Sequence, residues 1–116
     1  TEELVMTLER NLEQAGLAWA LVDSWEFNAL AIEETQRQLL SLCFMIFHLG
    51  LGYTNEMQGK LAGFVEVAAT GYSNPGKVPY HNWYHAVDVT HCVFRLLNLC
   101  ATERFLSNVE RFSLII

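Results

Sequence analysis

Apolar residues recur at helical spacing along most of the chain. A first amphipathic helix is predicted by four apolar positions that share one face: Leu4, Val5, Leu8 and Leu12. Gly16 follows this stripe and is expected to end the helix. The pattern is helical again from Asn28, and over residues 39–49 it is apolar on nearly all sides. Such a helix is typical of the middle of a bundle, and it is expected to stop near Gly50 and Gly52.

A third helix is predicted after these glycines. Thr54 or Asn55 can cap its start, and Gly71 is expected to close it. Its predicted core stripe consists of five residues: Met57, Leu61, Phe64, Val65 and Ala68. Residues 72–79, which contain serine, asparagine, glycine and two prolines, are predicted to form a loop.

Two further helices follow the loop. The pattern predicts a fourth helix over residues 81–99, and Ser107 with Glu110 forms a capping-box signature for a fifth that starts near Asn108. No segment alternates as a strand does, so the predicted fold class is all-α. The fifth pattern runs to Ile116 without a glycine cap, a basic last turn or a proline, so we expect the natural chain to continue.

Composition supports the idea of a piece of a larger unit. Hydrophobic residues make up 52% of the 116 residues and charged residues only 17%, below the quarter usual in soluble domains. Much of the surface is therefore expected to be covered. The net charge is −6 and no cluster of Lys and Arg is present, so neither nucleic acid nor an anionic membrane is an expected partner.

The cysteines and the longest apolar run indicate in which cellular compartment the protein is expected. Cys43, Cys92 and Cys100 show no CxxC spacing and sit in apolar helical patterns, which predicts reduced, buried thiols. The apolar run at residues 39–52 is interrupted by His48 and is too short to span a bilayer. No signal-peptide pattern is present, so a soluble, cytoplasmic protein is expected.

Candidate chemistry is concentrated in residues 80–91. His81 and His85 are four positions apart, which on a helix places their Cβ atoms about 5–6 Å from each other. Asp88 falls on the same stripe, whereas His91 is turned roughly 80° away. One imidazole could ligate a metal that acidifies water, while an unligated imidazole protonates a leaving oxygen. On spacing alone, a hydrogen-bonded structural pair remains the more common alternative.

The order Tyr-His-Asn-x-x-His-Ala at residues 80–86, followed by Val89 and His91, resembles the signature helix of class I cyclic nucleotide phosphodiesterases. The Val-Pro pair before it and the helical patterns from Trp25 onward are similar to that family too. The resemblance implies the all-α, multi-helix phosphodiesterase catalytic fold, with residues 1–116 as its N-terminal part. It also implies hydrolysis of the 3′,5′-cyclic nucleotides cAMP and/or cGMP to 5′-monophosphates, with the cyclic nucleotide as the partner.

The resemblance also implies roles for individual residues. His81 matches the family's general acid, which contacts the substrate and protonates its O3′ leaving group, and His85 matches the first zinc ligand. The cofactors would be a binuclear pair of Zn²⁺ and Mg²⁺ (or Mn²⁺), whose remaining ligands are expected beyond Ile116. Tyr80 would bind substrate from the pocket wall, although an aromatic packed at the helix start is an equal alternative.

Other polar and aromatic residues are expected to be structural. Asn82 is interpreted as a helix-start residue. Helical geometry nominates Asp88 as a ligand, but the family takes its metal carboxylates from later helices, so a solvated or capping role, or support of His85, is expected. His48 and His91 are expected to be packed or hydrogen-bonded. Three phenylalanines are assigned to the core: Phe44, Phe47 and Phe64.

Two alternatives compete with a cyclic nucleotide phosphodiesterase. A different metal-dependent phosphohydrolase would keep His85 as a ligand but need not use His81 as an acid. A non-enzymatic helical interaction module would use the apolar surface as a partner interface and would bind no transition metal. Because residues 1–116 offer one expected ligand, the chain alone is expected to be inactive. Because its apolar fifth helix would lack the helices that cover it, the chain alone is also expected to be poorly soluble or molten.

Overall fold

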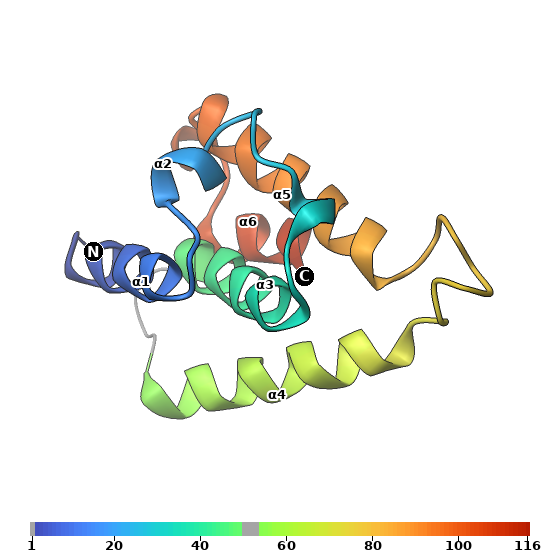
Figure 1. Ribbon diagram of the computed structural model, residues 1–116. Helices are drawn as coiled ribbons and strands as arrows, with labels where there is room; N and C mark the ends of the chain where they lie inside the picture. The colour runs from blue at the N-terminus through green and yellow to red at the C-terminus, as the bar shows by residue number, and fades with distance from the viewer. Residues whose placement is uncertain (1, 50–53) are drawn as a thin grey trace.

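The computed structural model describes the backbone of residues 2–49 and 54–116, with side chains from Met6 onward (Figure 1). Within these ranges the chain is all-α, as predicted, and no strand occurs. The helices and 3₁₀ turns are α1 (Glu2–Gln14), α2 (Trp19–Val22), η1 (Ala29–Ala31), α3 (Glu34–Leu49), α4 (Asn55–Gly71), α5 (Trp83–Leu99), η2 (Thr102–Arg104) and α6 (Asn108–Ile115). Two predictions lie outside the described residues: the packing of the Leu4 and Val5 side chains, and the helix stop near Gly50 and Gly52.

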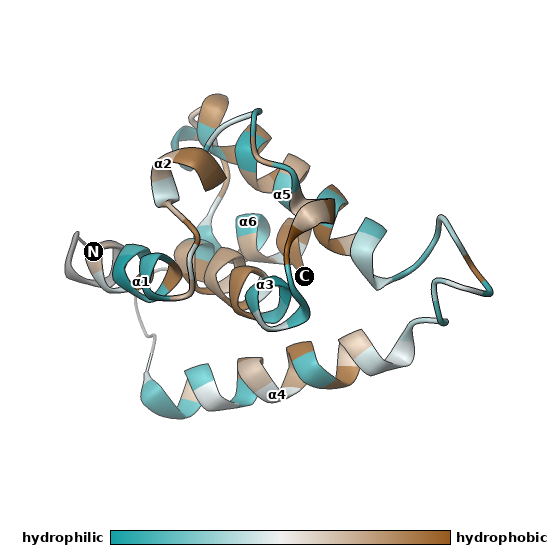
Figure 2. Cartoon of the chain, in the orientation of Figure 1, coloured by the Kyte–Doolittle hydropathy of each residue, from teal (hydrophilic) through white to brown (hydrophobic). Residues whose placement is uncertain are grey.

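Helix α3 is the centre of the fold. It contacts α1, α4, α5 and α6, and Figure 2 shows it as a mostly hydrophobic run enclosed by the other helices. Leu40, Phe44 and Ile46 have no exposed surface, and the Phe44 ring stacks on Phe94 of α5 with centroids 4.4 Å apart. Full burial of such a side chain is worth about 1.5–3 kcal/mol. The prediction of a helix buried in the middle of a bundle is confirmed.

The N-terminal helix ends as predicted. Gly16 has a φ of +88°, a left-handed conformation that suits glycine, and Leu17 N donates to Leu12 O across 2.8 Å. The short helix α2 was not predicted, because four residues are too few to show a periodic pattern. Trp19 in α2 packs edge-on against Phe94, with centroids 5.7 Å apart, and so ties α2 to the core.

The predicted start of the second helix at Asn28 is wrong. The Asn28 side chain accepts from Leu30 N across 3.1 Å and caps the 3₁₀ turn η1 instead. Ile32 is then extended, with φ −96° and ψ 162°, so that helix α3 begins only at Glu34. An asparagine side chain that bonds to nearby backbone offers the chain this alternative to a continuous helix.

The predicted caps of α4 and α6 are confirmed. Thr54 accepts from Met57 N across 3.1 Å at the start of α4, which ends at Gly71. Ser107 and Glu110 form the complete capping box that starts α6 at Asn108. Each of these caps depends on residues close together in the sequence, so both could be predicted without knowledge of the fold.

The predicted core stripe of α4 is only partly correct. Leu61 and Val65 are buried, whereas Met57 and Phe64 are 39% and 43% exposed. Helix α4 lies along one side of the bundle and packs mainly on α3, so only a narrow line of its residues is covered (Figure 1). The assignment of Phe64 to the core was therefore wrong, while Phe44 is buried and Phe47 is partly buried against the core.

The cysteines also differ from the prediction. Cys43 is buried, and burial raises its pKa to about 12, but Cys92 and Cys100 are exposed. Cys92 lies on the outward face of α5 and Cys100 is the C-cap of that helix. All three are free thiols. Among the described residues, no helix combines the length and the hydrophobicity needed to cross a lipid bilayer.

Candidate functional site

Helix α5 begins at an asparagine cap. Asn82 is extended, with φ −132° and ψ −176°, and its Oδ1 accepts from His85 N across 3.1 Å. Its Nδ2 donates to Val78 O across 3.0 Å, and only 4% of the residue is exposed. The interpretation of Asn82 as a helix-start residue is confirmed. The predicted helix start at His81 is wrong, because a residue before an extended cap cannot be helical.

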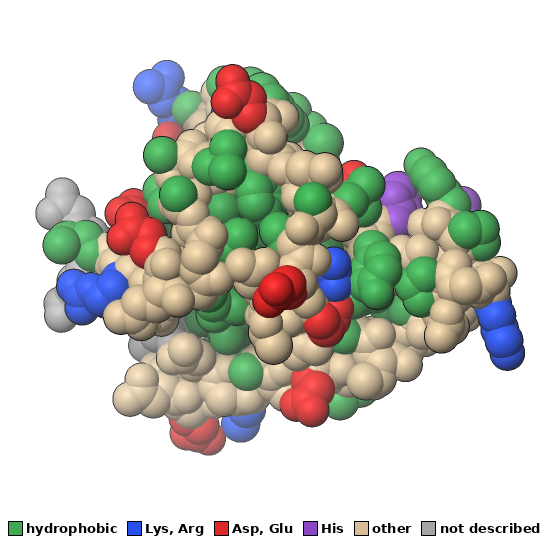
Figure 3. Space-filling view, in the orientation of Figure 1, with side chains coloured by type: hydrophobic (Ala, Val, Ile, Leu, Met, Phe, Trp, Pro, Cys, Tyr) green, Lys and Arg blue, Asp and Glu red, His purple; other side chains and the backbone are tan. Residues whose placement is uncertain are grey.

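His81 and His85 lie together, although not for the reason predicted. His81 is exposed in the loop before the cap, and His85 is partly buried in the first turn of α5. Their ring centroids are 5.7 Å apart, with the planes nearly perpendicular. The exposed ring of Tyr80 lies 4.8 Å from His81 and 4.3 Å from His85. Three rings from residues 80–85 thus form one cluster at an edge of the molecule, where Figure 3 shows histidine beside hydrophobic side chains.

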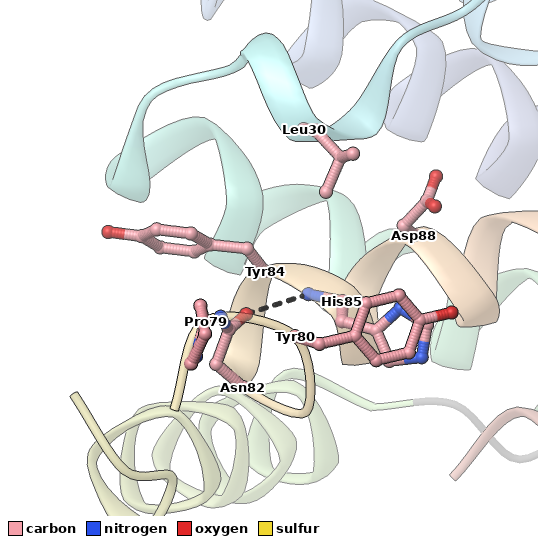
Figure 4. A pocket seen from close by; sticks show the side chains of 7 residues that line it. All are labelled: Leu30, Pro79, Tyr80, Asn82, Tyr84, His85 and Asp88. Atoms are coloured by element: carbon pink, nitrogen blue, oxygen red, sulfur yellow. Dashed lines mark hydrogen bonds between the residues drawn. The ribbon is translucent and has the colours of Figure 1, made fainter. Parts of the chain in front are cut away.

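Two hollows meet at His85. The first has a volume of about 240 Å³, and Figure 4 shows the side chains around it: Leu30, Pro79, Tyr80, Asn82, Tyr84, His85 and Asp88. The second has a volume of about 400 Å³ and is lined by Tyr72, His81, Asn82, His85, Ala86, Val89, Thr90, Leu114, Ile115 and Ile116. Among the described residues, His85 and Asn82 alone line both hollows, and His81 lines the second but not the first.

The imidazoles have free donor atoms but form no complete metal site. The ring nitrogens of His81 and His85 make no hydrogen bond to any described residue. The described part of the chain holds no group of three or more His, Cys, Asp or Glu residues placed to bind a metal ion. A catalytic zinc usually takes three protein ligands. The described residues therefore offer isolated imidazole donors at His81 and His85 but not a complete zinc site.

Comparison with known proteins identifies the family. Residues 80–116 match the family model described as 3′5′-cyclic nucleotide phosphodiesterase. Over 99 residues, 81% of the chain, it is 34% identical to the dual specificity calcium/calmodulin-dependent 3′,5′-cyclic nucleotide phosphodiesterase 1C of Mus musculus. The proteins of the same name from Rattus norvegicus and Homo sapiens are also 34% identical over 99 residues. The chain belongs to the class I cyclic nucleotide phosphodiesterase family.

The similarity to these phosphodiesterases covers a small part of them. The chain spans 14% of the length of the mouse and human proteins and 13% of the rat protein. No solved structure matches the chain significantly. The segment of this chain that matches the family model begins at Tyr80 and includes α5 and α6. The three-ring cluster therefore lies at the start of that segment.

Asp88 lies near His85 of the candidate site but makes no hydrogen bond to it. It lines the smaller hollow together with His85 (Figure 4), and its side chain has no hydrogen bond or ion pair with a described residue. Of the expected roles, capping and support of the His85 ring are therefore wrong for the described residues. The side chain of Asp88 is half-buried and lines the smaller hollow.

His91 and His48 are packed in the core, as predicted. His91 is buried, and its Nε2 lies 2.7 Å from Val22 O. His48 is 2% exposed, and neither of its ring nitrogens has a hydrogen-bond partner among the described residues. Burial and, to a smaller extent, the positive charge of Arg111 lower the pKa of His48 to about 4, while the negative charge of Glu103 acts in the opposite direction. Neither histidine lines the two hollows at His85.

Sequence reasoning missed a polar and aromatic cluster behind the first turn of α5. Its members are Glu34 and Arg37 of α3 and Trp83 and Tyr84 of α5. Trp83 and Tyr84 occupy the two variable positions of the Tyr-His-Asn-x-x-His pattern, so the pattern assigned them no role. The helical spacing of Glu34 and Arg37 was a local signal for an ion pair, but nothing local linked it to α5.

Proposed function

We propose that the protein containing this chain hydrolyses 3′,5′-cyclic nucleotides, cAMP and/or cGMP, to 5′-monophosphates and so ends second-messenger signalling. The observation that carries the proposal is the 5.7 Å separation of His81 and His85 at the start of the segment that matches the family. The names of the similar proteins support the same substrate class. We further propose that the protein is cytoplasmic.

His81 acts as the general acid in this proposal. Its imidazole is exposed, lines the larger hollow and makes no hydrogen bond to a described residue, so a substrate oxygen can approach it. Proton donation to the departing O3′ requires a heavy-atom distance of about 2.6–3.2 Å, which an open imidazole on a loop can reach. Tyr80, whose ring lies against both histidines, forms a wall of the substrate pocket.

His85 acts as a metal ligand in the same proposal. Its backbone is held in the first turn of a capped helix, which restrains the position from which the imidazole projects, as suits a metal ligand. The centre would be a pair of Zn²⁺ and Mg²⁺ (or Mn²⁺), which when bound supplies positive charge for the phosphoryl oxygens. Residues 1–116 form the N-terminal part of the catalytic domain, and the remaining ligands come from other parts of that domain.

Hydrolysis by the purified full-length protein tests the proposal. Turnover of cAMP or cGMP, its loss on treatment with a chelator and its recovery with Zn²⁺ and Mg²⁺ are expected. Two control substrates, 2′,3′-cyclic AMP and p-nitrophenyl phosphate, should be poor. Preference for either control would favour a different phosphohydrolase, and absence of both turnover and zinc would favour a helical interaction module. Residues 1–116 alone are expected to be inactive.

A further inference from the structure

We propose that Glu34 and Arg37 are positioning residues for the candidate site. They hold Trp83 and Tyr84 in the first turn of α5 and thereby set the direction of the His85 imidazole. The inference rests on the proposed function of His85. Neither Glu34 nor Arg37 lines the two hollows at His85, so any effect on the site must pass through α5.

Glu34 joins the beginnings of two helices that are distant in sequence. Its Oε1 accepts from the indole Nε1 of Trp83 across 2.9 Å, over a separation of 49 residues. The same oxygen accepts from Gln38 Nε2 across 3.0 Å, which orients the carboxylate on α3. A charged acceptor makes a stronger hydrogen bond to the indole than a neutral one. Trp83 is the first residue of α5, so this bond acts where the helix begins.

Arg37 holds the adjacent residue of α5. Its Nη1 donates to Glu34 Oε2 across 2.5 Å and its Nη2 to Ile32 O across 2.6 Å, and only 4% of the residue is exposed. Its guanidinium carbon lies 4.0 Å from the centroid of the Tyr84 ring. A cation over the face of an aromatic ring is attracted by the negative charge of that face. Because these partners orient the guanidinium, it presents a fixed surface to Tyr84.

The two contacts restrain the turn that carries His85. Trp83 and Tyr84 immediately precede His85, and the Asn82 side chain accepts from His85 N. The Trp83 ring also contacts Tyr72 at the end of α4, with centroids 5.8 Å apart. A displacement of about 1 Å in a catalytic constellation can cost about 10²-fold in rate. Loss of the Glu34 contacts is therefore expected to affect the site as well as the stability.

The chain contains a matched control for this cluster. Arg95, further along α5, pairs with Asp23 Oδ1 across 2.5 Å and lies 5.2 Å from the centroid of the Trp25 ring. This second cluster also combines a partly buried arginine, a carboxylate and an aromatic ring. It differs in place, because it connects the segment after α2 to the C-terminal half of α5. Substitution of Asp23 should destabilise the protein without turning the His85 imidazole.

The experiment compares Glu34→Ala, Glu34→Gln and Asp23→Ala in the full-length protein. The readouts are kcat, KM, the zinc dissociation constant from chelator competition, and Tm. Glu34→Ala is expected to lower kcat about 10-fold or more with KM little changed, and to weaken zinc binding several-fold. Glu34→Gln keeps an acceptor for Trp83 and should recover part of both losses. Asp23→Ala should lower Tm to a similar extent while kcat and zinc affinity stay within about twofold.

Several outcomes would overturn the inference. One is a Glu34→Ala variant whose kcat and zinc affinity match those of Asp23→Ala at a similar loss of Tm. If Glu34→Ala fails to fold, Trp83→Phe serves in its place, because it removes the indole donor and retains a ring. Unchanged zinc affinity in that variant would refute the positioning of His85 through Trp83. If the wild-type protein hydrolyses neither nucleotide, the proposed function fails, and the zinc affinities still decide whether Glu34 positions His85.

Discussion

The imidazole of His81 lies 5.7 Å from that of His85, although only His85 belongs to helix α5. The Asn82 cap separates the loop that carries the first histidine from the helix that carries the second. The cap holds the backbone of His85, whereas His81 precedes the cap and is not part of the helix. Substitutions at the two positions should therefore have separable effects.

His85→Ala is expected to remove the metal bound at this position and essentially all hydrolysis. An imidazole ligand at about 2.0–2.1 Å from zinc cannot be replaced by a methyl group. Elemental analysis of the purified full-length variant beside wild type measures the zinc. A variant that retains its full zinc content would exclude His85 as a ligand.

His81→Ala is expected to retain the metal but to slow turnover by roughly 10²–10⁴-fold, the usual range for loss of a general acid. A substrate with a better leaving group needs less protonation and should recover part of the loss. Steady-state rates for a cyclic nucleotide and for an analogue with a more acidic leaving alcohol provide the comparison. Equal slowing for both substrates would show that His81 does not protonate the leaving group.

The elements with local signals were predictable from sequence. The central helix α3 was recognised from its continuous apolar pattern, and the starts of α4 and α6 from Thr54 and the Ser107–Glu110 box. Each of these signals depends on residues within one or two turns. The same local reasoning placed His81 in a helix, because it could not decide whether Asn82 would cap α5 or continue it.

Contacts between distant segments could not be predicted. The bond from Trp83 to Glu34 spans 49 residues, and the burial of Arg37 depends on where α5 crosses α3. Exposure of Phe64 likewise depends on how few helices cover α4. The closeness of the two histidines was predicted from helical spacing. The rings do lie close together, but the reason was wrong, because His81 lies in the loop, which brings it back toward the first turn of α5.

Asn82→Ala is expected to destabilise the protein by about 1–3 kcal/mol. It removes the acceptor for His85 N, a loss of about 1 kcal/mol for a helix cap, and leaves Val78 O without its donor. Asn82→Asp keeps the cap acceptor but cannot donate to Val78 O, so it should lie between alanine and wild type. Thermal unfolding of the three proteins gives the order. Equal Tm values for alanine and wild type would show that the cap contributes nothing.

His48 is expected to make stability depend on pH. The residue is 2% exposed, its ring lies 5.1 Å from Phe47 and 5.2 Å from Phe94, and its nitrogens have no partner among the described residues. Burial lowers its pKa from 6.5 to about 4; nearby Arg111 acts in the same direction and Glu103 in the opposite one. The folded state therefore favours the neutral imidazole, whereas the unfolded chain takes up a proton below about pH 6.5.

The sign of the effect follows from this difference in proton binding. Between about pH 6.5 and 4 the unfolded state holds more protons, so stability falls as the pH falls; from pH 7.5 to 5 the loss is about 2 kcal/mol. His48→Leu replaces the imidazole with an apolar side chain of similar size and removes the proton uptake. Tm should then fall less between these pH values than in wild type. Equal falls in both proteins would mean that His48 is protonated as easily in the folded protein as in the unfolded chain.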